Sequence, residues 1–225
     1  MALVACGGCG TPPVAAPTRM SAPDTASWRA SRKSLAELRA KWGAEPGTMN
    51  LAVRLVSHTT GTDMSGRGVV AVDPPESLRM VLLGPGGLTA LDLLVRGEHW
   101  RLSIPARDKT FRDGQTSEDQ SRYLPVRFLR WWLLTPLQGR LVAAWERDGR
   151  SEWVLRDDRS VLDVASLGDR LEVTRRGAAT ERVVASGGRC GTARYENEDI
   201  GLSVEVRCES WRAGRPDPRV FAAEK

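Results

Sequence analysis

Apolar residues recur at every second position over most of this 225-residue chain, and this period constrains the fold more than any other feature of the sequence. The pattern runs from Asn50 to Ile104, as in Leu51, Val53 and Leu55, and again from 141 to 207. In a β-strand this spacing places the apolar side chains on one face. Short Gly- and Pro-containing turns separate the segments, with no helical pattern between successive strands. We therefore predict a mainly β (α+β) protein with an antiparallel sheet of about ten or eleven strands.

Two segments depart from this pattern and are predicted to be helices. The first runs from Ser27 to Trp42, with Ser27 as the N-cap, Leu35 and Leu38 at helical spacing and a Gly immediately after its end. The second, Tyr123 to Leu137, is apolar over more than half of its circumference, which exceeds the stripe of about 100° on an ordinary surface helix. It must be covered on two sides or contact a ligand. Simple core packing of its two tryptophans is the alternative. Its apolar residues include Phe128, Leu129, Trp131, Trp132 and Leu133.

The first residues of the chain indicate export and lipid anchoring. Leu3-Val4-Ala5-Cys6 resembles the lipobox of bacterial lipoproteins, in which the cysteine accepts the lipid. A signal peptide also needs an apolar stretch of about 7 to 15 residues, so we expect the natural start to lie upstream. Residues 7 to 26 are rich in Gly, Pro, Ala, Thr and Ser, which is typical of a flexible tether. We predict a tether over 1–26 and a single β-domain over 27–225. A disordered N-terminus in which Cys6 has no role is the alternative.

The remaining cysteines divide into two pairs. Cys6 and Cys9 have CxxC spacing but lie in the Gly- and Pro-rich segment without a second ligand pair, so we expect neither a metal nor a redox role. Cys190 and Cys208 lie in two segments that read as successive strands. We predict a disulfide between them, for which an export route would supply an oxidising compartment. Two unpaired thiols in the core are the alternative.

The sequence offers little catalytic or nucleic-acid-binding chemistry. The net charge of +5 comes mainly from arginines scattered singly among apolar residues, without a basic run or a recognisable nucleic-acid-binding module. His58 and His99 are isolated, and no metal-ligand cluster, nucleophile elbow or phosphate-binding loop is present in the sequence. We therefore expect a binding protein with no catalytic residue, cofactor or metal, and no nucleic-acid partner.

The stretch Leu82-Leu83-Gly84-Pro85-Gly86-Gly87-Leu88-Thr89-Ala90-Leu91 resembles the strand–turn–strand of the LolA/LolB-type outer-membrane lipoprotein carriers and receptors. The order of lipobox, helix, strands, apolar helix and further strands is also similar to that family. Gly86 stands where the family often has Leu, and a Cys190–Cys208 bridge is not a family requirement. The resemblance implies a curved, unclosed antiparallel half-barrel whose concave face is capped by helices and holds acyl chains or lipoproteins.

The resemblance also assigns roles and a location. Leu88 would contact the membrane, with a place in the core of the sheet as its alternative. The expected ligand-binding residues are Phe128, Leu129, Trp131, Trp132, Leu133 and Trp100. The protein would be anchored to the outer membrane of a Gram-negative bacterium, face the periplasm and receive cargo from a periplasmic carrier protein. An envelope protein that binds a protein partner is the second hypothesis. A concave cavity would favour the first, and a filled core with an exposed sheet edge the second.

Overall fold

A computed structural model describes residues 25–222, apart from 60, 98, 106–107, 113–125, 158–159 and 178–179. Within these ranges the chain forms two α-helices and thirteen strands, together with short 3-10 helices. The helices are α1 (Thr25–Trp42) and α3 (Val126–Leu134), and the 3-10 helices are η1 (Pro85–Gly87), η3 (Gly188–Cys190) and η4 (Pro218–Phe221). The strands are β1 (Gly47–Ser57), β2 (Thr62–Asp73), β3 (Ser77–Leu83), β4 (Thr89–Arg96), β5 (His99–Ile104), β6 (Lys109–Arg112), β7 (Arg140–Arg147), β8 (Arg150–Arg156), β9 (Val161–Leu167), β10 (Arg170–Arg176), β11 (Thr180–Ser186), β12 (Thr192–Asn197) and β13 (Leu202–Ala213).

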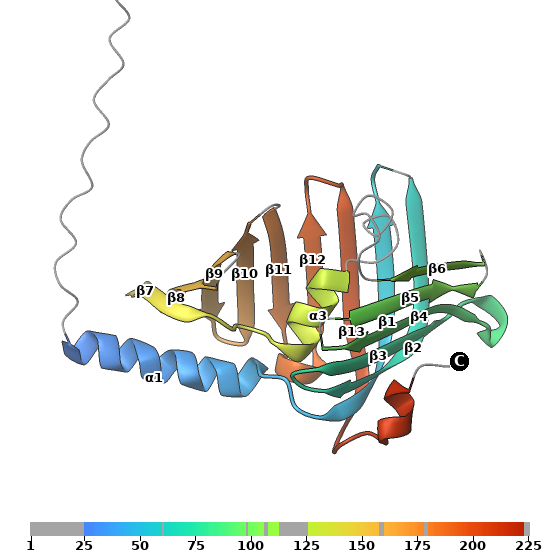
Figure 1. Cartoon of the computed structure of the whole chain (residues 1–225). Helices are drawn as coiled ribbons and strands as arrows, with labels where there is room; N and C mark the ends of the chain where they lie inside the picture. The colour runs from blue at the N-terminus through green and yellow to red at the C-terminus, as the bar shows by residue number, and fades with distance from the viewer. Residues whose placement is uncertain are drawn as a thin grey trace, which may run out of the picture.

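All of these strands belong to one antiparallel sheet, in the order β6-β5-β4-β3-β2-β1-β13-β12-β11-β10-β9-β8-β7. The sheet is curved and unclosed, with β6 and β7 at its two edges (Figure 1). The chain first builds one half of the sheet outward from β1. It then crosses to the opposite edge through α3 and returns strand by strand, so that β13 pairs with β1 in the centre. This is the mainly β, half-open architecture that the sequence predicts.

The expected number of ten or eleven strands is too low. One strand not expected from the sequence is the edge strand β6, Lys109–Arg112, which lies in a polar stretch of the chain. A strand of four residues with Phe111 as its one apolar side chain carries no alternation that sequence reading can detect. The first residues of β2, from Thr62 to Arg67, also lack this alternation, because they are mostly polar and exposed. Helix α1 begins at Thr25, so Ser27 lies inside the helix rather than at its N-cap.

The concave face of the sheet forms the hydrophobic core with the two helices. Alternate residues of nearly every strand point into it, for example Leu51, Val53 and Leu55 of β1. Helix α3 lies across the middle of this face, in front of β12 and β13, and α1 runs along the lower end of the β7–β11 side (Figure 1). Helix α3 therefore covers the middle of the concave face and α1 lies along one end, which roughly matches the expected helical cap. Residues 1–24, with Cys6 and the proposed tether, lie outside the described residues.

The convex face carries charged side chains that pair across neighbouring strands. Arg54 of β1 pairs with Asp63 of β2 at 2.7 Å, and Arg176 of β10 with Asp163 of β9 at 2.7 Å. Such exposed pairs contribute about 0 to 1 kcal/mol each, so they keep this face polar rather than hold the fold together. At one place η4 covers the convex face, where Phe221 is buried against β2 and β4. The arginines that raise the net charge are thus largely a solvated outer surface.

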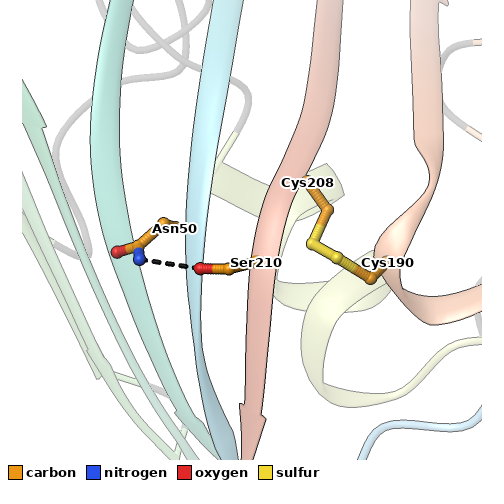
Figure 2. Close-up of a disulfide and its surroundings, with 4 residues drawn as sticks. All are labelled: Asn50, Cys190, Cys208 and Ser210. Atoms are coloured by element: carbon orange, nitrogen blue, oxygen red, sulfur yellow. Dashed lines mark hydrogen bonds between the residues drawn. A yellow bond between two sulfur atoms is a disulfide. The ribbon is translucent and has the colours of Figure 1, made fainter.

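A disulfide joins Cys190, at the end of η3, to Cys208 of β13, with 4.9 Å between the two Cα atoms (Figure 2). This is the pair considered for bonding in the sequence analysis. On the far side of β13 from the bridge, Asn50 Nδ2 of β1 donates a hydrogen bond to Ser210 Oγ at 2.8 Å (Figure 2). The bridge therefore fixes the turn between β11 and β12 to the central strand of the sheet.

Candidate functional site

The candidate site lies beneath α3, where the concave face meets a cluster of aromatic side chains. Every described side chain of α3 is buried or half-buried, including those of Phe128 and Leu129. Phe128 stacks on Tyr195 of β12 with 4.2 Å between ring centroids, and Trp132 lies 6.1 Å from Trp42 at the end of α1. A short helix with so wide an apolar surface is stable only when most of that surface is covered. Here the sheet and the end of α1 provide that cover.

A small cavity of about 60 Å³ remains between α3, the end of α1 and the centre of the sheet. Its wall is mainly apolar, with Trp42, Trp132 and Leu133 on the helices and Met49, Val70, Val72, Ala193 and Val206 on the strands. A water molecule occupies about 30 Å³ in the liquid, whereas sites for small organic ligands measure about 300 to 1,000 Å³. In this state the side chains of α3 therefore occupy the space that a larger apolar ligand would need.

Arg189 closes one end of this cavity. Its guanidinium donates a hydrogen bond to the carbonyl oxygen of Gly43 at 3.0 Å, pairs with Glu45 and lies 5.7 Å from the ring centroid of Trp211. Cys190, the next residue, carries the disulfide. The disulfide and Arg189 together hold the end of α1 against the turn between β11 and β12. This side of the cavity is therefore fixed by polar and covalent contacts.

Arg39 of α1 holds the segment that follows α3. Its Nε donates to the carbonyl oxygen of Leu137 at 3.0 Å and its Nη2 to that of Gly139 at 2.7 Å. Partial burial lowers the pKa of Arg39 from its usual value, but an arginine remains charged in proteins. Leu137 is buried with a φ of 57°, which is unusual for a residue with a side chain. The hydrogen bonds of Arg39 secure this turn, so the C-terminal end of α3 is anchored to α1.

A polar cluster lies on the same concave face beside the first turn of α3. Tyr195 donates its hydroxyl to Glu181 at 2.9 Å, and Arg175 Nη1 pairs with the other oxygen of Glu181 at 3.0 Å. Asn197 Nδ2 donates to the hydroxyl oxygen of Tyr195 at 3.3 Å. Burial, followed by the neighbouring Glu181 carboxylate, raises the pKa of Tyr195 well above its usual range, so this hydroxyl stays protonated.

The structure brings most of the predicted ligand-binding residues together. Phe128 and Leu129 are buried, while Trp131, Trp132 and Leu133 are half-buried and pack against the same core. Of these five, Trp132 and Leu133 line the cavity. The remaining predicted residue, Trp100 of β5, also packs on the core but does not line the cavity.

Leu88 occupies a different part of the molecule. It follows η1 at the tip of the turn between β3 and β4, and 75% of its surface is exposed. The alternative in which this side chain points into the core is therefore wrong. Its contact with a membrane stays a prediction.

Several residues of the site were not identified from the sequence. Trp42 was placed on the apolar face of the first helix but not at a site, because its neighbour Trp132 is 90 positions away along the chain. Arg189 was hidden among scattered arginines, although its position next to Cys190 was a usable signal. Tyr195 and Asn197 occupy alternating positions of a strand, and only tertiary structure reveals that Phe128 covers the tyrosine.

The described residues contain no group of three or more His, Cys, Asp or Glu side chains placed to hold a metal ion. Neither α1 nor α3 is long and apolar enough to cross a membrane.

Solved structures with a similar fold place this architecture among known proteins, although no family model and no curated protein matches the sequence. A DUF1329 family protein from Desulfovibrio piger is 10% identical with a TM-score of 0.56, and the match covers 86% of this chain and 96% of that chain. A LolA superfamily protein from Nitrosomonas europaea is 12% identical with a TM-score of 0.54, over 85% and 97% of the two chains. An outer membrane lipoprotein-sorting protein domain from Vibrio parahaemolyticus is 14% identical with a TM-score of 0.51, over 84% and 97%. The chain therefore has a LolA/LolB-like fold.

Proposed function

We propose that this chain is a lipid-anchored envelope protein that binds the acyl chains of lipids or lipoproteins on its concave face and acts in lipoprotein localisation. The observation that carries the proposal is a short helix with an unusually wide apolar surface that covers an apolar concave sheet face. The names of two similar structures, a LolA superfamily protein and a lipoprotein-sorting domain, support it. No catalytic group is required, because binding of acyl chains needs only apolar surface and a cover that can move.

Binding in this proposal exchanges the side chains of α3 for acyl chains. Burial of a large apolar side chain contributes about 1.5 to 3 kcal/mol, and each buried CH₂ group of a lipid about 0.8 kcal/mol. About two to four methylenes thus offset one displaced side chain such as Phe128 or Leu129. Since Arg39 anchors the segment after α3, the helix would move from its N-terminal end. The small cavity beside Trp132 marks where an acyl chain would first enter.

An assembly protein that binds a protein partner is the second candidate function. Two observations favour it: the cavity beneath α3 measures only about 60 Å³, and β7 forms an open edge with Val142 and Trp145 exposed. An open edge strand offers backbone groups for pairing with another chain. However, a register shift between Leu141 and Ala143 interrupts the pairing of this edge strand with β8, and such irregularities discourage further pairing. We therefore give acyl binding precedence.

Native mass spectrometry tests the acyl-binding function. The full chain with Cys6→Ala, which carries no anchor of its own, is expressed with export in a Gram-negative host and then offered palmitoyl ligands. We expect adducts whose masses match whole acyl ligands. A protein that carries no lipid and takes up none would contradict the proposal. Binding of another envelope protein through β7, lost on substitution of Val142 by Lys, would instead establish the second function.

The anchor and the membrane contact need their own tests. Cys6→Ala is expected to release the protein from the membrane fraction, and unchanged fractionation would refute lipidation at this residue. In the released protein, Leu88→Glu is expected to weaken flotation with phospholipid vesicles, because it removes an exposed apolar residue from the tip of a turn. Leu167→Glu is the matched control, since Leu167 is an exposed leucine at the end of β9 and before the turn to β10. Equal flotation of both variants would argue against a specific role for Leu88.

A further inference from the structure

The polar cluster beneath α3 contains one acceptor without a partner. Asn197 is only 6% exposed, and its Oδ1 has no hydrogen-bond partner among the described residues. A buried polar atom without a partner costs about 1 to 3 kcal/mol and calls for an explanation. Asn197 lies on the concave face, opposite Glu181 in the register of β11 and β12 and two residues beyond Tyr195. Its unpaired oxygen is therefore on the face that the proposed ligand would occupy.

The orientation of the Asn197 amide follows from its neighbours. The hydroxyl proton of Tyr195 goes to Glu181, which leaves the phenol oxygen able only to accept from Asn197. The Asn197 NH₂ group must therefore face Tyr195, and its carbonyl oxygen is the free group. Arg175 in turn holds Glu181 in place. The cluster thus presents one hydrogen-bond acceptor in a fixed position and needs a donor to satisfy it.

This acceptor lies in line with the cavity along one strand. Ala193 lines the cavity, and Asn197 follows four residues later on β12, or about 13 Å further along the same face. Phe128 covers the stretch between them through its contact with Tyr195. An acyl chain that replaces α3 and extends from the cavity along β12 would bring its head to Asn197.

We propose that Asn197 forms a headgroup subsite, in which its Oδ1 accepts a hydrogen bond from an N–H or O–H group at the head of the acyl ligand. This proposal rests on the acyl-binding function above and narrows it to a ligand class. Amide-linked acyl chains, as on an N-acylated peptide, and acylglycerols both provide such a donor. An ionised fatty acid offers none, and its carboxylate would face Glu181. The subsite therefore selects acyl chains by what is attached to them.

The test compares three probes with the same brominated palmitoyl chain, whose bromine quenches the fluorescence of nearby tryptophans. The N-methylamide has one N–H donor, the monoacylglycerol has hydroxyl donors, and the methyl ester has no donor. The amide carbonyl is a stronger acceptor than the ester carbonyl, so the indole N–H groups of Trp42 and Trp131, which have no partner among the described residues, could also favour the amide. Two controls separate this effect from the subsite: the monoacylglycerol and the methyl ester share an ester carbonyl, and Asn197→Leu leaves both indoles in place. Affinities are measured with the full Cys6→Ala chain, with Asn197→Leu added, and with Asn50→Leu added as the matched control on the convex face.

We expect the N-methylamide to bind about tenfold more tightly than the ester, as one additional hydrogen bond in a buried site predicts. Asn197→Leu should reduce this ratio to about one, while Asn50→Leu should leave it unchanged.

Other outcomes narrow or overturn the proposal. If only the monoacylglycerol binds more tightly than the ester, the subsite prefers hydroxyl donors. If only the N-methylamide does so, the subsite prefers amide donors. Equal binding of all three probes would overturn the subsite and leave acyl binding intact. If no probe binds, acyl binding itself fails. If Asn197→Leu does not fold, the monoacylglycerol and the methyl ester, which share an ester carbonyl, still decide in the parent chain.

Discussion

The two helices cover the same concave face but are held there in different ways. Helix α1 has one buried stripe, formed by Leu35, Leu38 and Trp42, and its other face is exposed. Polar contacts secure it along its length: Trp153 Nε1 donates to Ser31 near its start, and Arg189 binds Gly43 just beyond its end. Helix α3 is half as long and is held mainly by aromatic and aliphatic packing.

This difference distinguishes a helix that is fixed to the sheet, α1, from a helix that a ligand could displace, α3. Hydrogen bonds are directional, and loss of one partner leaves a buried polar group without its bond. Apolar contacts have no such requirement, since an acyl chain satisfies Phe128 or Tyr195 as well as another side chain does. We therefore assign α1 to the scaffold, and in the proposed function α3 occupies the place of the ligand. The following predictions test this division, from the largest expected effect to the smallest.

Truncation of the buried stripe of α1 should have the largest effect. Leu35→Ala removes a side chain that is 3% exposed, and such substitutions lower the free energy of unfolding by about 2 to 5 kcal/mol. Urea denaturation measures the loss. Ala36→Gly on the exposed face is the control, with a loss of about 1 kcal/mol from helix propensity alone. A Leu35→Ala effect no larger than the control would mean that α1 is not part of the core.

Removal of the disulfide should destabilise the fixed side of the cavity. The bridge closes a loop with a sequence separation of 18, for which chain entropy predicts about 3 kcal/mol. We expect the double variant Cys190→Ser and Cys208→Ser to lose about this amount in urea denaturation, with faster hydrogen exchange at the end of α1. If hydrogen exchange became faster in α3 alone, the disulfide would stabilise α3 rather than α1, and the assignment of α1 to the scaffold would be contradicted.

Arg39 joins the two helices, so its removal should affect both. Arg39→Met keeps much of the aliphatic stem but leaves the carbonyl groups of Leu137 and Gly139 without their donor. The expected loss in free energy of unfolding is about 1.5 to 3 kcal/mol, as for hydrogen bonds from a charged group. Acyl ligands should also exchange faster, because the C-terminal end of α3 is released. Slower exchange in stopped-flow fluorescence would contradict the anchoring role.

A matched pair of tryptophan variants gives the smallest effect and the sharpest contrast. Trp153→Phe removes the long hydrogen bond of 3.4 Å to α1 and should cost about 1 kcal/mol. Trp131→Phe removes a buried indole N–H that has no partner among the described residues, so its effect on unfolding should be close to zero. A larger loss for Trp131→Phe than for Trp153→Phe would reverse the proposed roles of the two helices.

Local sequence patterns predicted the architecture well and the site only in part. The period of two predicted the antiparallel sheet, and the unusually wide apolar surface of residues 123–137 predicted a helix, which the structure has over Val126–Leu134. Strand β6 was missed because Phe111 is its one apolar residue. Four residues of the site were not predicted, because their partners lie far away in the chain or on a neighbouring strand. They are Arg39, Arg189, Tyr195 and Asn197. Arginine in particular looks the same in sequence whether it is solvated, as Arg54 is, or holds a turn, as Arg39 does.

The central claim, that α3 gives way to the ligand, is tested most directly by tying α3 to the sheet. Cysteines at Phe128 and Tyr195, whose rings are in contact, can be joined by a short thiol cross-linker in a chain with Cys6 and Cys9 replaced by Ser. A second pair at Ser31 and Trp153 ties α1 to β8 in the same way. We predict that cross-linking α3 lowers the affinity for the brominated N-methylamide at least tenfold relative to the same variant without cross-linker, whereas cross-linking α1 does not. Undiminished binding with α3 cross-linked to β12 would contradict the claim that α3 gives way to the ligand.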